Sequence, residues 1–137
     1  MKYTDIIREL PLLFAAMFTA ILFLQSGLDK VFDRKGNLEW LTGHFSKTFV
    51  AGMVPVMLAQ ITVLELLTGI AAAAGIISFF AAGSTIVIFG ASVLGALTLS
   101  ALFFGQRIAK DYPGAVVLVP YFILELIAMY LSMPKGI

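Results

Sequence analysis

Four apolar segments dominate the sequence, and each is close to the length that a helix needs to cross a lipid bilayer. The segments cover residues 11–28, 54–77, 83–104 and 114–133. An α-helix rises about 1.5 Å per residue, so about 20 apolar residues cross a hydrocarbon core that is about 30 Å thick. We therefore predict an all-α membrane protein, a four-transmembrane-helix bundle in which residues 1–137 form a single integral membrane domain.

The composition agrees with this fold class and limits the chemistry. Hydrophobic residues make up 61% of the chain and charged residues 12%, against about half and a quarter in soluble domains. The chain has no cysteine and one histidine, so thiol chemistry, iron–sulfur ligation and a protein-built metal site are not expected. A net charge of +1 argues against nucleic acid as a partner. Any redox role would then be indirect or depend on a bound organic molecule, for which a quinone is our candidate.

The only long polar segment, residues 29–52, lies between the first two spans. Leu38, Leu41, Phe45 and Phe49 recur at helical spacing after a charged turn, which predicts a short amphipathic helix. Trp40 and the two phenylalanines favour a position at the membrane interface. A lid packed over the end of the bundle explains the same pattern equally well.

Proline and glycine suggest where the spans begin and end. Pro11 is expected in the opening turn of the first helix and Pro113 at the start of the fourth. The uncharged stretch from Gly75 to Gly83 predicts a tight turn between the second and third spans. Four spans place both termini on one side of the membrane. Six of the nine Lys and Arg residues fall in the loops on the other side, which favours cytoplasmic loops.

Small residues recur every four positions in the third span. Ser92, Ala96 and Ser100 form one such row, and Gly69 with Ala73 repeats the spacing in the second span. Rows of this kind let helix backbones approach closely in lipid. They predict close packing, either within the bundle or between copies in a homo-oligomer.

Two acidic residues lie in the middle of apolar spans, Glu65 in the second and Glu125 in the fourth. An ionised carboxylate at that depth costs about 3 kcal/mol or more. Each residue is therefore expected to be protonated, paired, or directed into a polar cavity.

Other polar residues could serve these acids. Tyr121 lies one helical turn before Glu125, so its phenol could share a proton with the carboxyl group. Gln25 and Asp29 share one face of the first span, and Lys30 at its end can reach inward. One interpretation is an interhelical polar network of Glu65, Glu125, Lys30 and Gln25 that stabilises the bundle. The other is a proton path, or a pocket for a polar head group.

Two short motifs resemble those of a known family. Gly27-x-x-Lys30 lies at the end of the first span, and Glu65-x-x-x-Gly69 lies in the second span, with Gly75 expected to end that helix. This order is similar to that of the DoxX family of small four-helix bacterial membrane proteins.

The resemblance implies a multi-pass protein of the bacterial cytoplasmic (inner) membrane that is linked to redox metabolism. Relatives in that family include a subunit of thiosulfate:quinone oxidoreductase and proteins associated with oxidative-stress complexes. The positions that match are Gly27, Lys30, Glu65 and Gly69. Glu125 belongs to no pattern of the family, and without cysteine a thiosulfate reaction would need a partner subunit or a bound quinone.

Three functions follow as hypotheses. The chain is an accessory subunit of a quinone-linked membrane oxidoreductase, with Glu65 and Lys30 handling a proton or orienting a head group. Alternatively it is a small transporter whose acids bind a proton or cation. The third hypothesis is a non-catalytic assembly or structural protein in which the polar network only fixes the fold.

Overall fold

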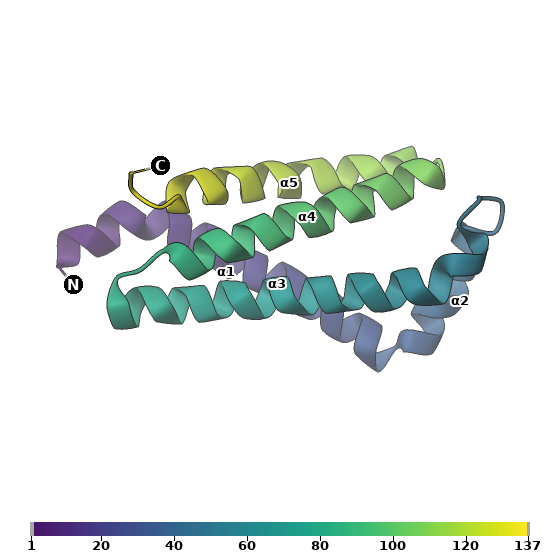
Figure 1. The fold of residues 1–137 in the computed structure, drawn as a ribbon, viewed down its shortest axis with the longest axis horizontal. Helices are drawn as coiled ribbons and strands as arrows, with labels where there is room; N and C mark the ends of the chain where they lie inside the picture. Colours follow the sequence, from purple (N-terminus) through teal and green to yellow (C-terminus); the bar gives the residue numbers. More distant parts are fainter. Residues whose placement is uncertain (1, 137) are drawn as a thin grey trace.

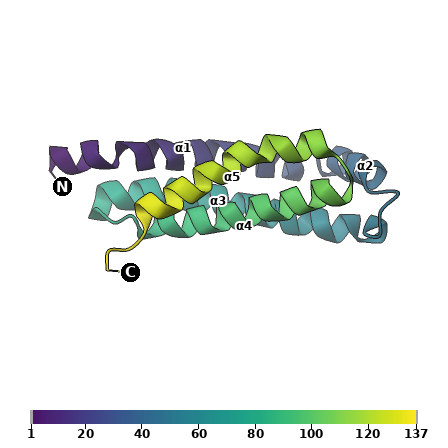
Figure 2. The same cartoon turned by 90° about the horizontal axis from the view of Figure 1, so that it is seen from above.

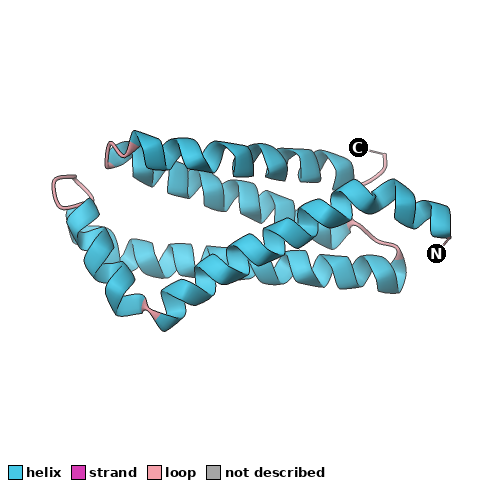
Figure 3. Ribbon diagram, turned by 180° about the vertical axis from the view of Figure 1, so that it is seen from behind, coloured by secondary structure: helices cyan, strands magenta, loops and turns pink. Residues whose placement is uncertain are grey.

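The computed structural model describes residues 2–136, and helices form nearly all of it (Figure 1). Among these residues there is no β-strand, and only short loops join the helices (Figure 3). In chain order the elements are α1 (Tyr3–Phe32), α2 (Arg34–His44), the 3-10 helix η1 (Ala51–Met53), α3 (Val54–Ala82), α4 (Ile86–Ile108) and α5 (Tyr112–Ser132).

The long helices α1, α3, α4 and α5 are each long and apolar enough to cross a membrane, as predicted. They run side by side in an up-and-down bundle (Figures 1 and 2). α3 packs closely against both α1 and α4, and α4 against α5, whereas α1 and α5 touch over a shorter length. Both termini and the α3–α4 turn lie at one end of the bundle, and α2 lies at the other (Figure 1).

Two of the predicted helix limits are wrong. α1 begins at Tyr3, so Pro11 lies inside the helix and not in its opening turn. The polar residues before Pro11 are helical too, and hydropathy does not detect a helix that continues beyond the apolar region. α3 continues past Gly75 to Ala82, and the turn is made by Gly83, whose φ of 68° is the left-handed conformation that glycine adopts without strain. The expected start of the last helix is confirmed, since Pro113 lies in the first turn of α5.

A short helix, α2, forms in the polar segment, but it ends before Phe45 and Phe49, two of the four residues whose spacing predicted an amphipathic helix. The Asp33 side chain caps it by accepting a hydrogen bond from the Gly36 backbone N–H at 3.2 Å, and it ends at His44. Phe45 follows the helix and is buried against Val50 and Val54.

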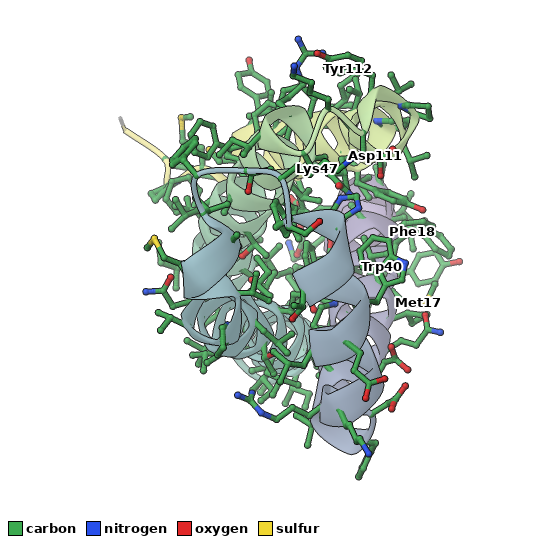
Figure 4. All side chains as sticks on the ribbon, turned by 90° about the vertical axis from the view of Figure 1, so that its right-hand side faces the viewer. Met17, Phe18, Trp40, Lys47, Asp111 and Tyr112 are labelled. Atoms are coloured by element: carbon green, nitrogen blue, oxygen red, sulfur yellow. The ribbon has the colours of Figure 1, made fainter. Side chains whose placement is uncertain are left out.

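The segment that contains α2 packs against the end of α4 and also carries exposed aromatic residues. Phe45 lies close to the end of α4, and His44 Nε2 lies 2.8 Å from Gln106 Oε1 on that helix. Trp40 stacks on His44 yet remains 59% exposed, and Phe49 is 83% exposed. Viewed from this end, Trp40 lies on the same side of the molecule as Met17 and Phe18 of α1 (Figure 4).

Small residues are used inside the bundle. Ala20, Ala72 and Ala91 form a buried cluster where α1, α3 and α4 meet, and Ser92 and Ala96 are buried nearby on α4. Ser92, Ala96 and Gly69 of the rows noted in the sequence therefore serve packing within one chain, whereas Ser100 is exposed.

Candidate functional site

The buried carboxylate of Glu65 forms an ion pair with Lys30, which joins α3 to the end of α1. Lys30 Nζ lies 3.0 Å from Glu65 Oε2 and donates a hydrogen bond of 3.2 Å to Oε1. Glu65 is 1% exposed, whereas the Lys30 side chain retains 16% of its surface. The pair therefore extends from the helix interface toward the surface of the bundle.

Lys30 has no ammonium hydrogen left for another ligand. Besides Glu65, it donates to Ser26 Oγ at 2.9 Å and approaches the Ser26 carbonyl at 3.4 Å, one turn earlier on α1. An ammonium group carries three N–H donors, and these contacts account for them. Glu65 Oε2 contacts the ammonium and forms no hydrogen bond with any other described residue. The two charges thus satisfy each other.

Glycines bring the two helices close enough for this contact. A Cβ placed on Gly27 would lie 3.2 Å from the Leu66 backbone nitrogen, and one on Gly69 would lie 2.8 Å from the Leu24 backbone nitrogen. A larger residue at Gly69 would push α1 and α3 apart, because real Cβ atoms are almost never found 2.8 Å from another backbone, and one at Gly27 would make an unusually tight contact. Gly27 and Gly69 therefore lie at the same helix contact as Lys30 and Glu65.

Glu125 of α5 occupies a separate buried site and is 1% exposed. Thr19 Oγ1 of α1 donates a hydrogen bond of 2.6 Å to Glu125 Oε1. The other oxygen, Oε2, has no partner among the residues that the structure describes. With no cation in contact, an ionised carboxylate here would cost several kcal/mol, so the neutral acid is the form that this site accommodates.

A glycine also makes room for this carboxyl group. A Cβ on Gly95 of α4 would lie 2.9 Å from both Glu125 Cδ and Oε2. The carboxyl group therefore lies directly against the α4 backbone, between α1 and α4. Nothing in the sequence pattern predicted that Thr19 and Gly95 would form this site, since each lies on a different helix from Glu125.

A third buried polar contact joins α3 and α4. The hydroxyl oxygens of Thr68 and Thr98 are 3.3 Å apart, and both residues are fully buried. Each hydroxyl also donates to a carbonyl of its own helix, Leu64 and Leu94 respectively, at 2.7 Å. The hydroxyl hydrogens of both threonines are thus donated within their own helices, and the contact between the two hydroxyls bridges the helices only weakly.

The remaining predicted site residues lie apart from the two acids. Gln25 and Asp29 are exposed on α1, although they precede Lys30 on the same helix. Tyr121 is partly buried and its ring packs on Phe18, with ring centroids 6.2 Å apart. The described residues include no hydrogen bond between Tyr121 and Glu125, whose partner is Thr19 instead.

The structure therefore brings together Lys30 and Glu65 and places Glu125 in a separate site with Thr19. The described residues contain no cluster of three or more His, Asp or Glu side chains that could hold a metal ion. The fold and these buried polar groups define a multi-pass helical membrane protein. No protein-family model, curated protein or solved structure matches this chain.

Proposed function

We propose that this protein is a DoxX-like subunit of the bacterial cytoplasmic membrane that accompanies a quinone-linked oxidoreductase. The observation that carries the proposal is the contrast between the two faces of α1. Lys30 is committed inward to Glu65, while Gln25 and Asp29 of the same helix are exposed. Polar side chains within or beside a span favour contact with protein or water over lipid, so this face suits a partner subunit.

The motif residues support the family resemblance through a physical link. Gly27, Lys30, Glu65 and Gly69 were matched by spacing alone, and all four belong to the contact between α1 and α3. A motif that fixes this contact would hold the outer face of α1 in one orientation. This role requires no chemistry from the pair itself.

A quinone head group does not fit the Lys30–Glu65 pair. The Lys30 donors are taken up by Glu65 and Ser26, and Glu65 is almost fully buried. We therefore assign the quinone to the partner oxidoreductase, and to this chain the docking and orientation of that partner.

The test is copurification from the native membrane in mild detergent. The wild type should bring down a protein with quinone reductase activity, with its quinone identified by mass spectrometry. The double variant Gln25→Leu with Asp29→Leu should lose most of that activity, because it removes the polar docking groups. Gln60→Leu, which changes an exposed amide on α3, is the matched control. The proposal is contradicted if no quinone reductase activity copurifies with the wild type. It is also contradicted if the double variant recovers as much of that activity as the wild type does.

A second candidate function, proton- or cation-coupled transport, is favoured by Glu125. Its unpartnered Oε2 is a buried oxygen that could exchange a proton, at a site built from α1, α4 and α5. In proteoliposomes that contain a pH-sensitive dye, this function predicts proton flux that Glu125→Gln abolishes and Glu65→Gln does not. Absence of flux with the wild type removes this candidate.

We also propose that α2 lies at the membrane interface. The exposure of Trp40 in α2 and of Phe49 beyond its end supports this position. Trp40 is the only tryptophan, so its fluorescence reports on α2 alone. Lipids brominated near the head group should quench this fluorescence more strongly than lipids brominated near the chain end. If neither lipid quenches it, α2 lies away from the bilayer.

A further inference from the structure

The outer face of α4 and α5 carries a groove of about 480 Å³, separate from both buried acids. Its walls are apolar and include Phe103 and Phe104 of α4 and Leu118 and Phe122 of α5. Phe104 is 65% exposed, so the groove opens on the side that faces away from the bundle. In a membrane-spanning helix pair, that side faces the hydrocarbon chains of lipid.

One end of the groove carries a cation. Arg107 lines it and lies in the last turn of α4, at the end of the bundle where α2 lies. The groove begins near Ser100, about two helical turns deeper in α4, so it runs along the helix from the apolar region toward the membrane surface. This arrangement matches an amphiphile whose chain lies in the groove and whose head group lies at Arg107.

The Arg107 guanidinium is held in place with its donors unused. Its central carbon lies 4.4 Å from the centroid of the Tyr112 ring. Stacking on a ring uses the flat face of the guanidinium and leaves the N–H groups at its edge available. Among residues 2–136, no carboxylate pairs with the Arg107 guanidinium and no hydrogen bond engages it.

The neighbouring charges favour an anion. Lys110 is exposed three residues later, and its φ of 59° is the left-handed conformation that usually favours glycine at a helix end. The nearest acid in sequence, Asp111, is engaged as the cap of α5 and accepts a hydrogen bond from the Gly114 N–H at 3.0 Å. Arg107 is the only charged residue in the lining of the groove, so the groove itself presents a cation and no acid.

We propose that this groove binds an anionic phospholipid, with one acyl chain against the aromatic walls and the phosphate on Arg107. A guanidinium binds phosphate through two parallel N–H donors, and basic pockets between transmembrane helices are typical sites for anionic lipid head groups. A second copy that docks groove to groove is a poorer occupant, because the two Arg107 cations would approach each other and the groove lining contains no acid to pair with them. The proposal does not depend on the function proposed above.

The experiment uses the full chain, delipidated in detergent and titrated with phosphatidylglycerol or phosphatidylcholine of identical acyl chains, with bound lipid counted by native mass spectrometry. The wild type should bind phosphatidylglycerol about tenfold more tightly, as expected for hydrogen bonds between ionised groups. Arg107→Gln should remove this preference but keep chain binding. Ser100→Phe, at an exposed position in the groove, should weaken binding of both lipids.

Arg34→Gln is the matched control, because Arg34 is an exposed arginine at the same end of the bundle but outside the groove. It should leave the preference for phosphatidylglycerol unchanged. The proposal is overturned if the wild type shows no preference, if Arg107→Gln retains it, or if Arg34→Gln removes it equally. A protein that appears only as a dimer, with its groove closed to both lipids, would overturn it in favour of a second copy.

Discussion

Lys30 Nζ lies 3.0 Å from Glu65 Oε2, and each residue is the only charged partner of the other among the described residues. Removing one partner leaves the other charge without compensation, which typically costs about 3–5 kcal/mol for a buried pair. We expect Lys30→Met to destabilise more than Glu65→Leu, because an isolated lysine can extend its amine to the surface while Glu65 cannot move. The double variant should be more stable than either single variant, as measured by denaturant unfolding in detergent. Additive losses would contradict the pairing and remove the basis for a purely structural role of these residues.

The contact between α1 and α3 should be intolerant of any side chain at Gly69. A Cβ there would lie 2.8 Å from the Leu24 backbone nitrogen, so Gly69→Ala should cost about 1–3 kcal/mol as the helices separate. Gly90 on α4 is the control, because nothing lies within 4 Å of its Cβ position. Gly90→Ala should leave stability unchanged or raise it by up to about 1 kcal/mol through helix propensity. Equal thermal shifts for the two variants would show that the close approach is not needed.

Gly95 and Glu125 should be energetically coupled. Gly95→Ala forces the Glu125 carboxyl group away from α4 and from its bond with Thr19, so we expect a loss of about 1–3 kcal/mol. In a Glu125→Ala background the same glycine substitution should cost almost nothing, since the clashing atoms are gone. A double-mutant cycle of unfolding free energies measures this coupling. A coupling near zero would mean that Glu125 does not lie against Gly95.

Phe45 and Phe49 provide a matched pair beyond α2. Phe45 is buried where the α2–α3 connection meets the end of α4, whereas Phe49 is 83% exposed. Phe45→Ala should lower the free energy of unfolding by about 3 kcal/mol, and Phe49→Ala by less than about 0.5 kcal/mol. If α2 is an anchor, Phe49→Ala should instead reduce the quenching of Trp40 by brominated lipid. The reverse order of stability losses would place Phe45 outside the packed core.

The topology can be tested because the chain has no cysteine of its own. Single cysteines at Thr4, Lys47 and Lys135 occupy exposed positions at the two ends of the bundle. An impermeant maleimide added to intact cells should label the cysteines at 4 and 135 to the same extent. The extent of labelling at 47 should differ from both. The excess of Lys and Arg in the loops predicts that residue 47 is the protected, cytoplasmic one. Labelling of Thr4→Cys but not Lys135→Cys would require an odd number of spans.

The four spans could be predicted from the sequence because hydropathy depends only on local composition. A bilayer of fixed thickness also sets the length that each apolar segment must have. The prediction failed at the helix limits for a related reason. The polar turns before Pro11 belong to α1 but lie outside the apolar stretch, and Gly75 indicated a turn although it serves close packing against Ile88. Glycine has both uses, and only the neighbouring helix distinguishes them.

The candidate site was predictable in part. Lys30 and Glu65 could be paired because each needs a counter-charge and few residues of opposite sign lie at that depth. The partner of Glu125 could not be found, because Thr19 is an uncharged residue 106 positions away and is one of five threonines in the predicted spans. Tyr121 shares a face with Glu125 by spacing, yet its ring packs outward on Phe18. Helix rotation decided which neighbour the acid would meet, and rotation is not encoded in hydropathy.

The position of the ion pair also bears on how the chain enters the bilayer during synthesis. Glu65 emerges 35 residues after Lys30, so neither helix can reach its final depth with its charge compensated until the other has been made. Because Lys30 can reach the surface and Glu65 cannot, α3 is accepted by the hydrocarbon at low cost only with α1 beside it, which favours insertion of the two as a helical hairpin. α5, the last helix to be made, then returns to the first when Glu125 meets Thr19, and this contact completes the bundle.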